Sequence, residues 1–429
     1  MITKFIREMV VFLFVSGISR LLPFLLTPLF THYLAPQEMG RLELILSLYN
    51  IFMVFGMCQL DTAVQRYFHQ SKAIPKTAFL GVLALSLLTS TFYLALMPVT
   101  SSLLSLGNSA YIELSLSGGC VLLANLHVIN GLVIRYGRPV KLVVFINILQ
   151  TTSFAGLACL EIIILKSGIK GYFFALLISY LVSLIAAMII LRKELLVKMN
   201  RVDLRKLLQF SLPQLPGRIA SVIAQYGNRF ILYIIFTQAV IGIFALSTKI
   251  ATLMLVGVSA FCMVWYPLLY DEKNKNALEN IRKIFNLVLC ILPIVTVLLF
   301  IITWIIFRFF IPQSYAEAQQ PTYIMIAATS LLVVKEMVDA GIKLSEKTKY
   351  ISYIYVINTI VLFVLMIIAG LTWGLMGVAF AIFISNILLT YSTWIVSEKL
   401  YPMKFNMKYC HGYVVFCFIS VITTYLWIK

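Results

Sequence analysis

Thirteen long apolar runs divide this chain, and each is long enough to cross a lipid bilayer as a helix. Because the bilayer core offers no partners for backbone amides, such runs fold as helices. Of the 429 residues, 61% are hydrophobic and only 12% are charged, which excludes an ordinary soluble domain. The runs are expected at 9–34, 42–65, 78–104, 111–134, 141–165, 171–191, 211–237, 241–269, 284–310, 320–342, 350–370, 374–397 and 410–428.

The basic residues are unevenly distributed, and their pattern predicts the orientation of the chain. The formal net charge is +18, from 34 Lys and Arg against 16 Asp and Glu. With a cytoplasmic N-terminus, most basic side chains lie in inner loops. The outer side then has only Arg41, Lys166, Lys170, Arg308 and Lys429. Membrane orientation therefore explains the charge, and no nucleic-acid partner is expected. The basic stretch 192–210 is predicted to be an amphipathic helix near anionic lipids.

This threading assigns a side of the membrane to each principal loop. The loops predicted to be cytoplasmic are 66–77, 135–141, 192–210 and 270–283. The loops 105–110 and 371–374 are predicted to face outside. All of these loops are short, so no large soluble domain is expected between the spans.

A weak internal repeat predicts two lobes. GYFFALLIS at 171–179 resembles GVAFAIFIS at 377–385. With six spans in each half, both halves enter from the same side, so the repeat is parallel. Such repeats usually place the substrate between them near mid-membrane. The expected fold is an all-α polytopic membrane protein with two six-helix lobes around a central cavity, plus a thirteenth span. The expected regions are 1–191 for the first lobe, 192–210 for a basic linker, 211–397 for the second lobe and 398–429 for the extra span.

The span from Ser211 to Thr237 contains the strongest sign of a binding site. Arg218, Gln225 and Arg229 are spaced so that they return to nearly one face of a helix. A charged residue at the centre of the bilayer costs roughly 2.5 kcal/mol or more, so this face should look into protein or water. The alternative is that both arginines snorkel to the surface or form ion pairs. We favour the first interpretation, the cationic wall of a cavity.

Further polar residues in the spans extend this prediction. Arg20 in the first span and Lys249 in the eighth add two more cations, and arginine binds phosphate through its fork of donors. The alternative for each residue is a polar side chain satisfied by a neighbouring helix. The predicted ligands of a phosphate or diphosphate are Arg20, Arg218, Arg229 and Lys249. The predicted polar lining of the cavity is Ser16, Thr27, Asn50, Gln214 and Gln225.

Span 320–342 contains a second group of charges. Lys335 and Asp339 are four residues apart, as are Asp339 and Lys343, so they can neutralise one another on one helix face. We favour a structural ladder of ion pairs, with a gate or a proton-linked site as the alternative for Lys335 and Asp339. Asp61 in the second span is another candidate for ion coupling.

No arrangement typical of an enzyme accompanies these groups. The sequence contains no phosphate-binding loop, nucleophile motif or metal motif. The seven cysteines show no Cys-x-x-Cys pair, so neither a disulfide framework nor a zinc site is expected. We therefore predict a protein without catalytic activity, metal or other cofactor.

The segment 12–53, FLFVSGISRLLPFLLTPLFTHYLAPQEMGRLELILSLYNIF, resembles the start of the polysaccharide-transport family of Wzx-type O-antigen flippases. Its most specific part is the proline-rich first helix followed by THYLAPQEMG at 31–40. The family belongs to the superfamily of multidrug, oligosaccharidyl-lipid and polysaccharide exporters. The resemblance implies translocation of an undecaprenyl-diphosphate-linked oligosaccharide from the inner to the outer leaflet of the bacterial inner membrane, by alternating access. The implied partners are this lipid-linked oligosaccharide, membrane lipids and other polysaccharide-assembly membrane proteins.

Two differences between this chain and relatives in the superfamily restrict the substrates that the resemblance implies. Relatives that flip lipid II share a Ser-Arg pair, matched here by Ser19-Arg20, and follow it with Arg-Asp where this chain has Leu26-Thr27. This argues against lipid II as the substrate. Multidrug antiporters typically carry a carboxylate in the N-terminal lobe, often in the first helix, and here none follows Glu8 in the first span. Asp61 is an embedded carboxylate, so a cation-coupled multidrug exporter stays as the alternative function. A membrane glycan polymerase is disfavoured by the short outer loops.

Overall fold

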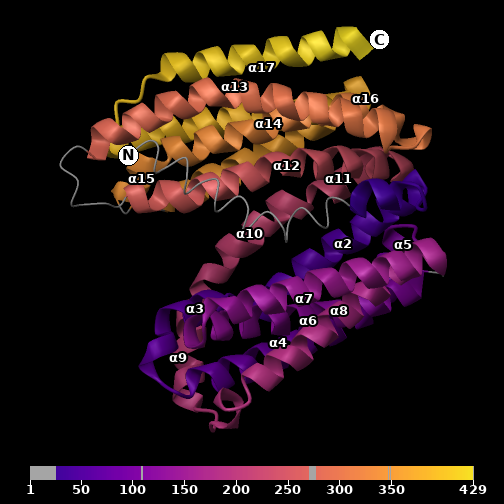
Figure 1. Ribbon diagram of the computed structural model, residues 1–429, viewed down its shortest axis with the longest axis vertical. Coiled ribbons are helices and arrows are strands. Elements are labelled where there is room, and N and C mark those ends of the chain that lie inside the picture. Colours follow the sequence, from indigo (N-terminus) through magenta and orange to yellow (C-terminus); the bar gives the residue numbers. More distant parts are fainter. Residues whose placement is uncertain (1–25, 108–109, 270–276, 346, 348, 429) are drawn as a thin grey trace. The chain divides into compact units, whose positions relative to one another are not determined.

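The structure is a computed structural model that describes residues 26–107, 110–269, 277–345, 347 and 349–428 (Figure 1). Every regular element within these ranges is helical, as the apolar runs predict. Nine of the described helices are long and apolar enough to cross a membrane. Most of the predicted first span, 9–34, lies outside the described residues.

Contacts between residues divide the chain into two compact units, one of which comprises Tyr33–Tyr233. Its long helices are α2 (Pro36–Met57), α4 (Ile74–Ala95), α6 (Ala110–Gly137), α7 (Val140–Cys159) and α8 (Gly168–Ile190). Helix α6 is central, because it packs against α2, α4, α7 and α8 (Figure 1). Its Ile129 is buried with Leu60 and Val82 in one apolar cluster. Helix α2 begins at Pro36, where the fixed φ of proline suits a first helical position.

Two predicted spans of this unit are interrupted. Helix α2 is followed by Cys58 and Gln59, whose φ angles of 45° and 58° are left-handed. Helix α3 (Leu60–Tyr67) begins directly after them. Left-handed residues other than glycine are strained, so the surrounding packing must hold this break in place. The predicted span 211–237 is likewise divided. A short turn containing Pro213 leads into α10 (Leu215–Tyr226), and α11 (Asn228–Ile235) follows it.

Only the second part of the basic stretch 192–210 is an α-helix, and this helix packs on the unit. Helix α9 (Arg201–Ser211) contacts α3 and α4, and its Leu207 is buried in the same apolar cluster as Leu60. The compact unit therefore includes this stretch and extends to Tyr233. The predicted lobe boundaries at 191 and 211 come from the sequence repeat, whereas the compact units are defined by contacts between residues. The lobe boundaries therefore stay a prediction.

The other unit consists of the described residues up to His32 together with those of Ile234–Lys429. Its helices are α12 (Gln238–Leu269), α13 (Ala277–Phe309), α14 (Gln319–Val338), α15 (Ala340–Leu344), α16 (Lys349–Leu400) and α17 (Met407–Ile428). Helix α14 contacts α12, α13, α16 and α17 and is buried on nearly all faces (Figure 1). An all-round apolar helix suits such a central position.

Helix α16 contains two predicted spans, 350–370 and 374–397, joined without a loop. Gly374 interrupts it with φ 62° and ψ −144°, a conformation that a residue with a side chain rarely adopts. The chain bends so sharply here that a Cβ added to Gly370 would lie 3.2 Å from a methyl group of Val378. A side chain at Gly377 would overlap the carbonyl of Ala369. The two predicted spans are thus confirmed as two helical segments that meet at Gly374.

Polar contacts bring the predicted inner loops of the first-described unit together at one end. Ser71 donates a hydrogen bond to Asp203 at 2.9 Å. Arg138 forms an ion pair with Glu194 at 2.8 Å. These contacts join loops 66–77, 135–141 and the stretch 192–210, which the charge pattern places on one side. The Arg41–Glu113 ion pair at 2.7 Å lies near the predicted outer loop 105–110 instead.

The orientation itself is a prediction that cysteine labelling can test. In a variant without the seven native cysteines, an impermeant maleimide should label Ser105→Cys in intact cells. It should label Lys72→Cys only after the cells are permeabilised, because basic loops stay in the cytoplasm. Both positions are exposed, so accessibility within the fold does not limit the reaction. Labelling of Lys72→Cys in intact cells would reverse the topology.

Candidate functional site

Arg229 on α11 lies beside a buried carboxylate on α2. Its Nε is 3.6 Å from Oε2 of Glu43, and the two side chains are 14% and 8% exposed. A second guanidinium nitrogen, Nη1, donates a hydrogen bond to Oδ1 of Asn228 at 2.7 Å. Arg229 therefore does not snorkel freely, and it does not belong to a face of cations without a counter-charge. This pair is the arrangement that the alternative interpretation expects, and a role of Arg229 in the wall of a cavity stays a prediction.

Arg218 lies one helix earlier and is exposed. The charges of Arg229, Glu43 and, more weakly, Arg218 all act on the hydroxyl of Tyr226. Arg218 and Arg229, which helical spacing places on one face, therefore both lie in the electrostatic surroundings of this tyrosine. We call Glu43, Arg218, Tyr226, Asn228 and Arg229 the arginine cluster.

Sequence reasoning missed Glu43 because it lies at the edge of an apolar run, where acidic residues usually belong to a loop. The predicted topology did not supply the missing signal. Glu43 is one residue from the outer end of its predicted span 42–65, whereas Arg229 is eight residues from the outer end of its predicted span 211–237. The predicted spans therefore do not place the two side chains at one depth.

Gln214 and Asp61 lie near the break between α2 and α3. The Thr62 hydroxyl donates a hydrogen bond to Oε1 of Gln214 at 3.4 Å, and the Gln214 amide donates to the Phe210 carbonyl at 2.9 Å. Oδ1 of Asp61 is buried and has no hydrogen-bond partner among the described residues. Such an oxygen is able to accept a proton or bind a cation, so Asp61 stays a candidate for ion coupling.

The other predicted lining residues are dispersed. Asn50 donates its amide to the carbonyl of Leu46 in its own helix at 2.7 Å, and Gln225 is exposed. Thr27 is buried and Lys249 is half-buried, and both belong to the other unit. Ser16 and Arg20 lie outside the described residues. Their predicted roles stay predictions.

The charges of the predicted span 320–342 form a closed network. Lys335 and Lys343 both donate to Oδ2 of Asp339, at 3.0 Å and 2.9 Å, which confirms the two ion pairs that the spacing predicts. Glu336 also bridges the two lysines, at 2.9 Å and 3.1 Å. The hydroxyl of Tyr266 on α12 contacts Glu336 and accepts a hydrogen bond from Lys343 at 2.9 Å.

The position of this network accounts for its geometry. Asp339 separates α14 from α15, and its side chain is fully buried. Two lysines and two carboxylates cancel in formal charge, which makes their burial tolerable. No sequence pattern pointed to Tyr266, because its place beside Glu336 depends on how α12 packs against α14. We call Tyr266, Lys335, Glu336, Asp339 and Lys343 the lysine network.

A family profile described as "Polysaccharide biosynthesis protein" matches residues 5–273. No curated protein sequence matches the chain.

Two kinds of solved structure share the fold. A lipid II flippase, MurJ, in an inward closed conformation has a TM-score of 0.75 at 18% identity, covering 97% of this chain and 92% of its own. A multidrug resistance MATE family transporter of the MOP superfamily, in an inward-facing conformation, has a TM-score of 0.70 at 15% identity, covering 89% of this chain and 94% of its own. At such low identity the likeness establishes the fold alone, whereas the profile covers more than half of the sequence. The chain therefore belongs to the polysaccharide biosynthesis protein family.

Proposed function

We propose that the chain translocates an oligosaccharide linked to a polyprenyl diphosphate from the inner to the outer leaflet of a bacterial inner membrane. The observation that carries this proposal is the arginine cluster. Among the described residues, it holds one half-buried and one exposed guanidinium with Glu43 as the carboxylate. The cluster thus has a surplus of positive charge, and the planar forks of its arginines match phosphate oxygens. Lys249 and Arg20 are further candidates to contact the diphosphate.

Glu43 has a specific part in this proposal. The 3.6 Å between Arg229 and Glu43 exceeds the 2.7–2.9 Å typical of a strong charge-assisted hydrogen bond. A diphosphate carries more negative charge than one carboxylate, so it can compete with Glu43 for Arg229. When the lipid leaves, Glu43 again supplies a counter-charge to the half-buried guanidinium of Arg229. The same carboxylate thereby limits affinity and favours release.

A second candidate function, a cation-coupled multidrug exporter, is favoured by the shared MATE fold and by Asp61, whose buried Oδ1 has no hydrogen-bond partner in the part of the chain that the structure describes. The arginine cluster argues against it, because net positive charge repels a lipophilic cation. Under the first proposal, Asp61 couples an ion to transport without binding the substrate. We also propose that the N-terminus lies in the cytoplasm, that the chain contacts other polysaccharide-assembly proteins, and that it has no catalytic activity.

Binding measurements on the purified protein separate these two functions. A short-chain polyprenyl diphosphate should bind with an affinity that falls as salt rises, because screening weakens the attraction to the arginine cluster. Ethidium should not bind appreciably. Asp61→Asn should reduce transport more than it reduces binding. Ethidium binding that Asp61→Asn removes, with no affinity for the diphosphate, would instead place the protein among the drug exporters.

A further inference from the structure

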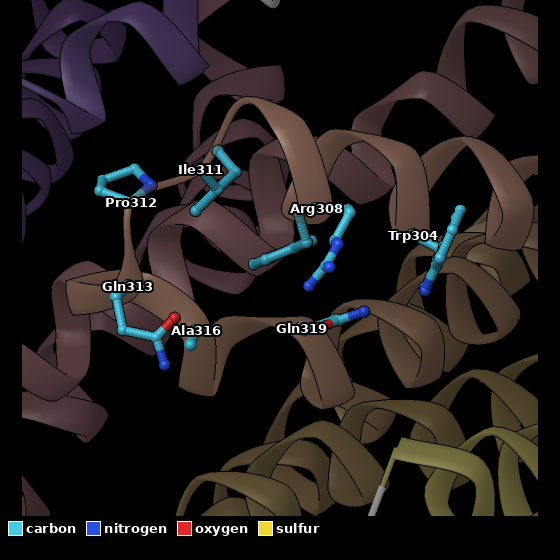
Figure 2. A pocket seen from close by; sticks show the side chains of 8 residues that line it. Trp304, Arg308, Ile311, Pro312, Gln313, Ala316 and Gln319 are labelled. Atoms are coloured by element: carbon cyan, nitrogen blue, oxygen red, sulfur yellow. The ribbon is translucent and has the colours of Figure 1, made fainter.

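A pocket of about 430 Å³ lies where α13 ends and the chain turns into α14. Its polar lining consists of Trp304 and Arg308 from α13, Gln313 from the turn and Gln319 from the start of α14. Trp304 and Arg308 are four residues apart, so they project from one helix face. Figure 2 shows both side chains extending toward Gln319, with Gln313 beside Ala316 at the other end of the pocket.

Three of the side chains that line this pocket, Trp304, Arg308 and Gln313, are exposed. Arg308 forms no ion pair with any residue that the structure describes. The Gln319 amide donates a hydrogen bond to the hydroxyl of Tyr323 at 3.1 Å, which fixes the direction of its side chain. Its Oε1 is thereby oriented as an acceptor.

A second pocket of about 450 Å³ adjoins the first and shares Ala316 and Gln319 with it. It adds Glu317, Gln320 and Trp373, and the indole of Trp373 is 70% exposed. The pair of pockets thus has a tryptophan on each side and glutamine amides between them. We call them the tryptophan pockets. Arg308 and Trp373 of the loop 371–374 contribute to them, and both are predicted to face outside.

We propose that the tryptophan pockets bind an acidic oligosaccharide on the outer side of the membrane. The apolar face of a sugar ring packs on an indole, and glutamine amides both donate to and accept from sugar hydroxyls. The fork of Arg308 matches a sugar carboxylate. Each pocket has a volume typical of a small-ligand site. The identity of the natural ligand, the transported glycan, rests on the proposed function, whereas binding of a soluble saccharide does not.

The alternative is that both tryptophans only anchor the protein at the membrane surface, where this residue is common. Anchoring explains why Trp304 and Trp373 are exposed. It does not explain why an arginine and three glutamines line the same two pockets. Phe309 offers a matched control, because it neighbours Arg308 and is 69% exposed but does not line either pocket.

The test uses the full chain in lipid nanodiscs, with soluble trigalacturonate and maltotriose as probes in titration calorimetry. The wild type should bind trigalacturonate more tightly than maltotriose. Trp304→Leu should weaken trigalacturonate binding by about tenfold or more. Arg308→Gln should abolish the preference for the acidic probe. Phe309→Leu should bind both probes as the wild type does.

Three outcomes would overturn the proposal: neither probe binds at about 10 mM, a concentration that detects even weak association; Trp304→Leu binds as the wild type does; or Phe309→Leu loses binding to the same degree. If maltotriose binds as tightly as trigalacturonate, Arg308 does not recognise a carboxylate, and the proposal of an acidic ligand is wrong. A short-chain polyprenyl diphosphate, which contains no sugar, is titrated on the same samples. Diphosphate binding without saccharide binding would sink the pocket proposal alone, and the converse would sink the proposed function alone.

Discussion

Replacing Arg229 by alanine should abolish export of the lipid-linked glycan while the protein still inserts into the membrane in normal amounts. Truncating one partner of a buried charge pair costs about 2–5 kcal/mol, so affinity for a polyprenyl diphosphate should fall at least about thirtyfold. Arg229→Lys should recover only part of the function, because lysine keeps the charge and loses the fork. Export is measured as glycan reaching the cell surface in a strain that lacks the native gene, and affinity by calorimetry.

Arg41 provides the matched control for this prediction. It forms a comparable ion pair with Glu113 in the same unit, at 2.7 Å and with side chains 18% and 9% exposed. Arg41→Ala should therefore lower stability in a similar way but leave the affinity for diphosphate unchanged. Glu43→Gln should strengthen diphosphate binding, because it removes the competing carboxylate from Arg229. Full export by the double variant Arg218→Ala/Arg229→Ala would refute a role for the arginine cluster.

Much of the fold follows from the length of the apolar runs. A run of about twenty apolar residues becomes a helix wherever it lies, so the spans at 111–134 and 171–191 correspond closely to α6 and α8. The breaks are less predictable. The break before α10 contains a proline, Pro213, which a sequence pattern can identify. At the break after α2, Cys58 and Gln59 adopt left-handed conformations although neither position is a proline or glycine. The packing around α2 imposes the break at Cys58 and Gln59, so the neighbouring residues in the sequence do not predict it.

The two clusters differ in the same way. The lysine network could be predicted in part because its lysines and Asp339 are neighbours on one helix face. The arginine cluster could not, because Glu43 and Arg229 are far apart in sequence and meet only through the packing of α11 near α2. Tyr266 was missed for the same reason. Local spacing identifies which charges belong together on one helix, and only tertiary contacts show what lies opposite them.

Replacing Asp339 by asparagine should destabilise the protein strongly. The carboxylate is fully buried and accepts from both Lys335 and Lys343, so its neutralisation leaves Glu336 as the one carboxylate that pairs with the two lysines among the described residues. Breaking a buried ion pair costs about 3–5 kcal/mol, because the remaining charge is desolvated without compensation. The measurement is thermal unfolding of the protein in nanodiscs, followed by the fraction that stays folded and monodisperse.

The ion pair between Lys283 and Glu279 is the appropriate control for this loss. It has the same four-residue spacing and a distance of 2.7 Å, but both side chains are about 60% exposed, so Glu279→Gln should cause no measurable change. An unchanged melting temperature for Asp339→Asn would show that the network does not support the fold. The double variant Lys335→Met/Asp339→Leu replaces one buried pair by apolar groups and should regain stability. If this stable variant exports glycan, the network is structural. If it does not, Lys335 and Asp339 act in gating or ion coupling, because a fold that is restored without transport leaves no other role for their charges.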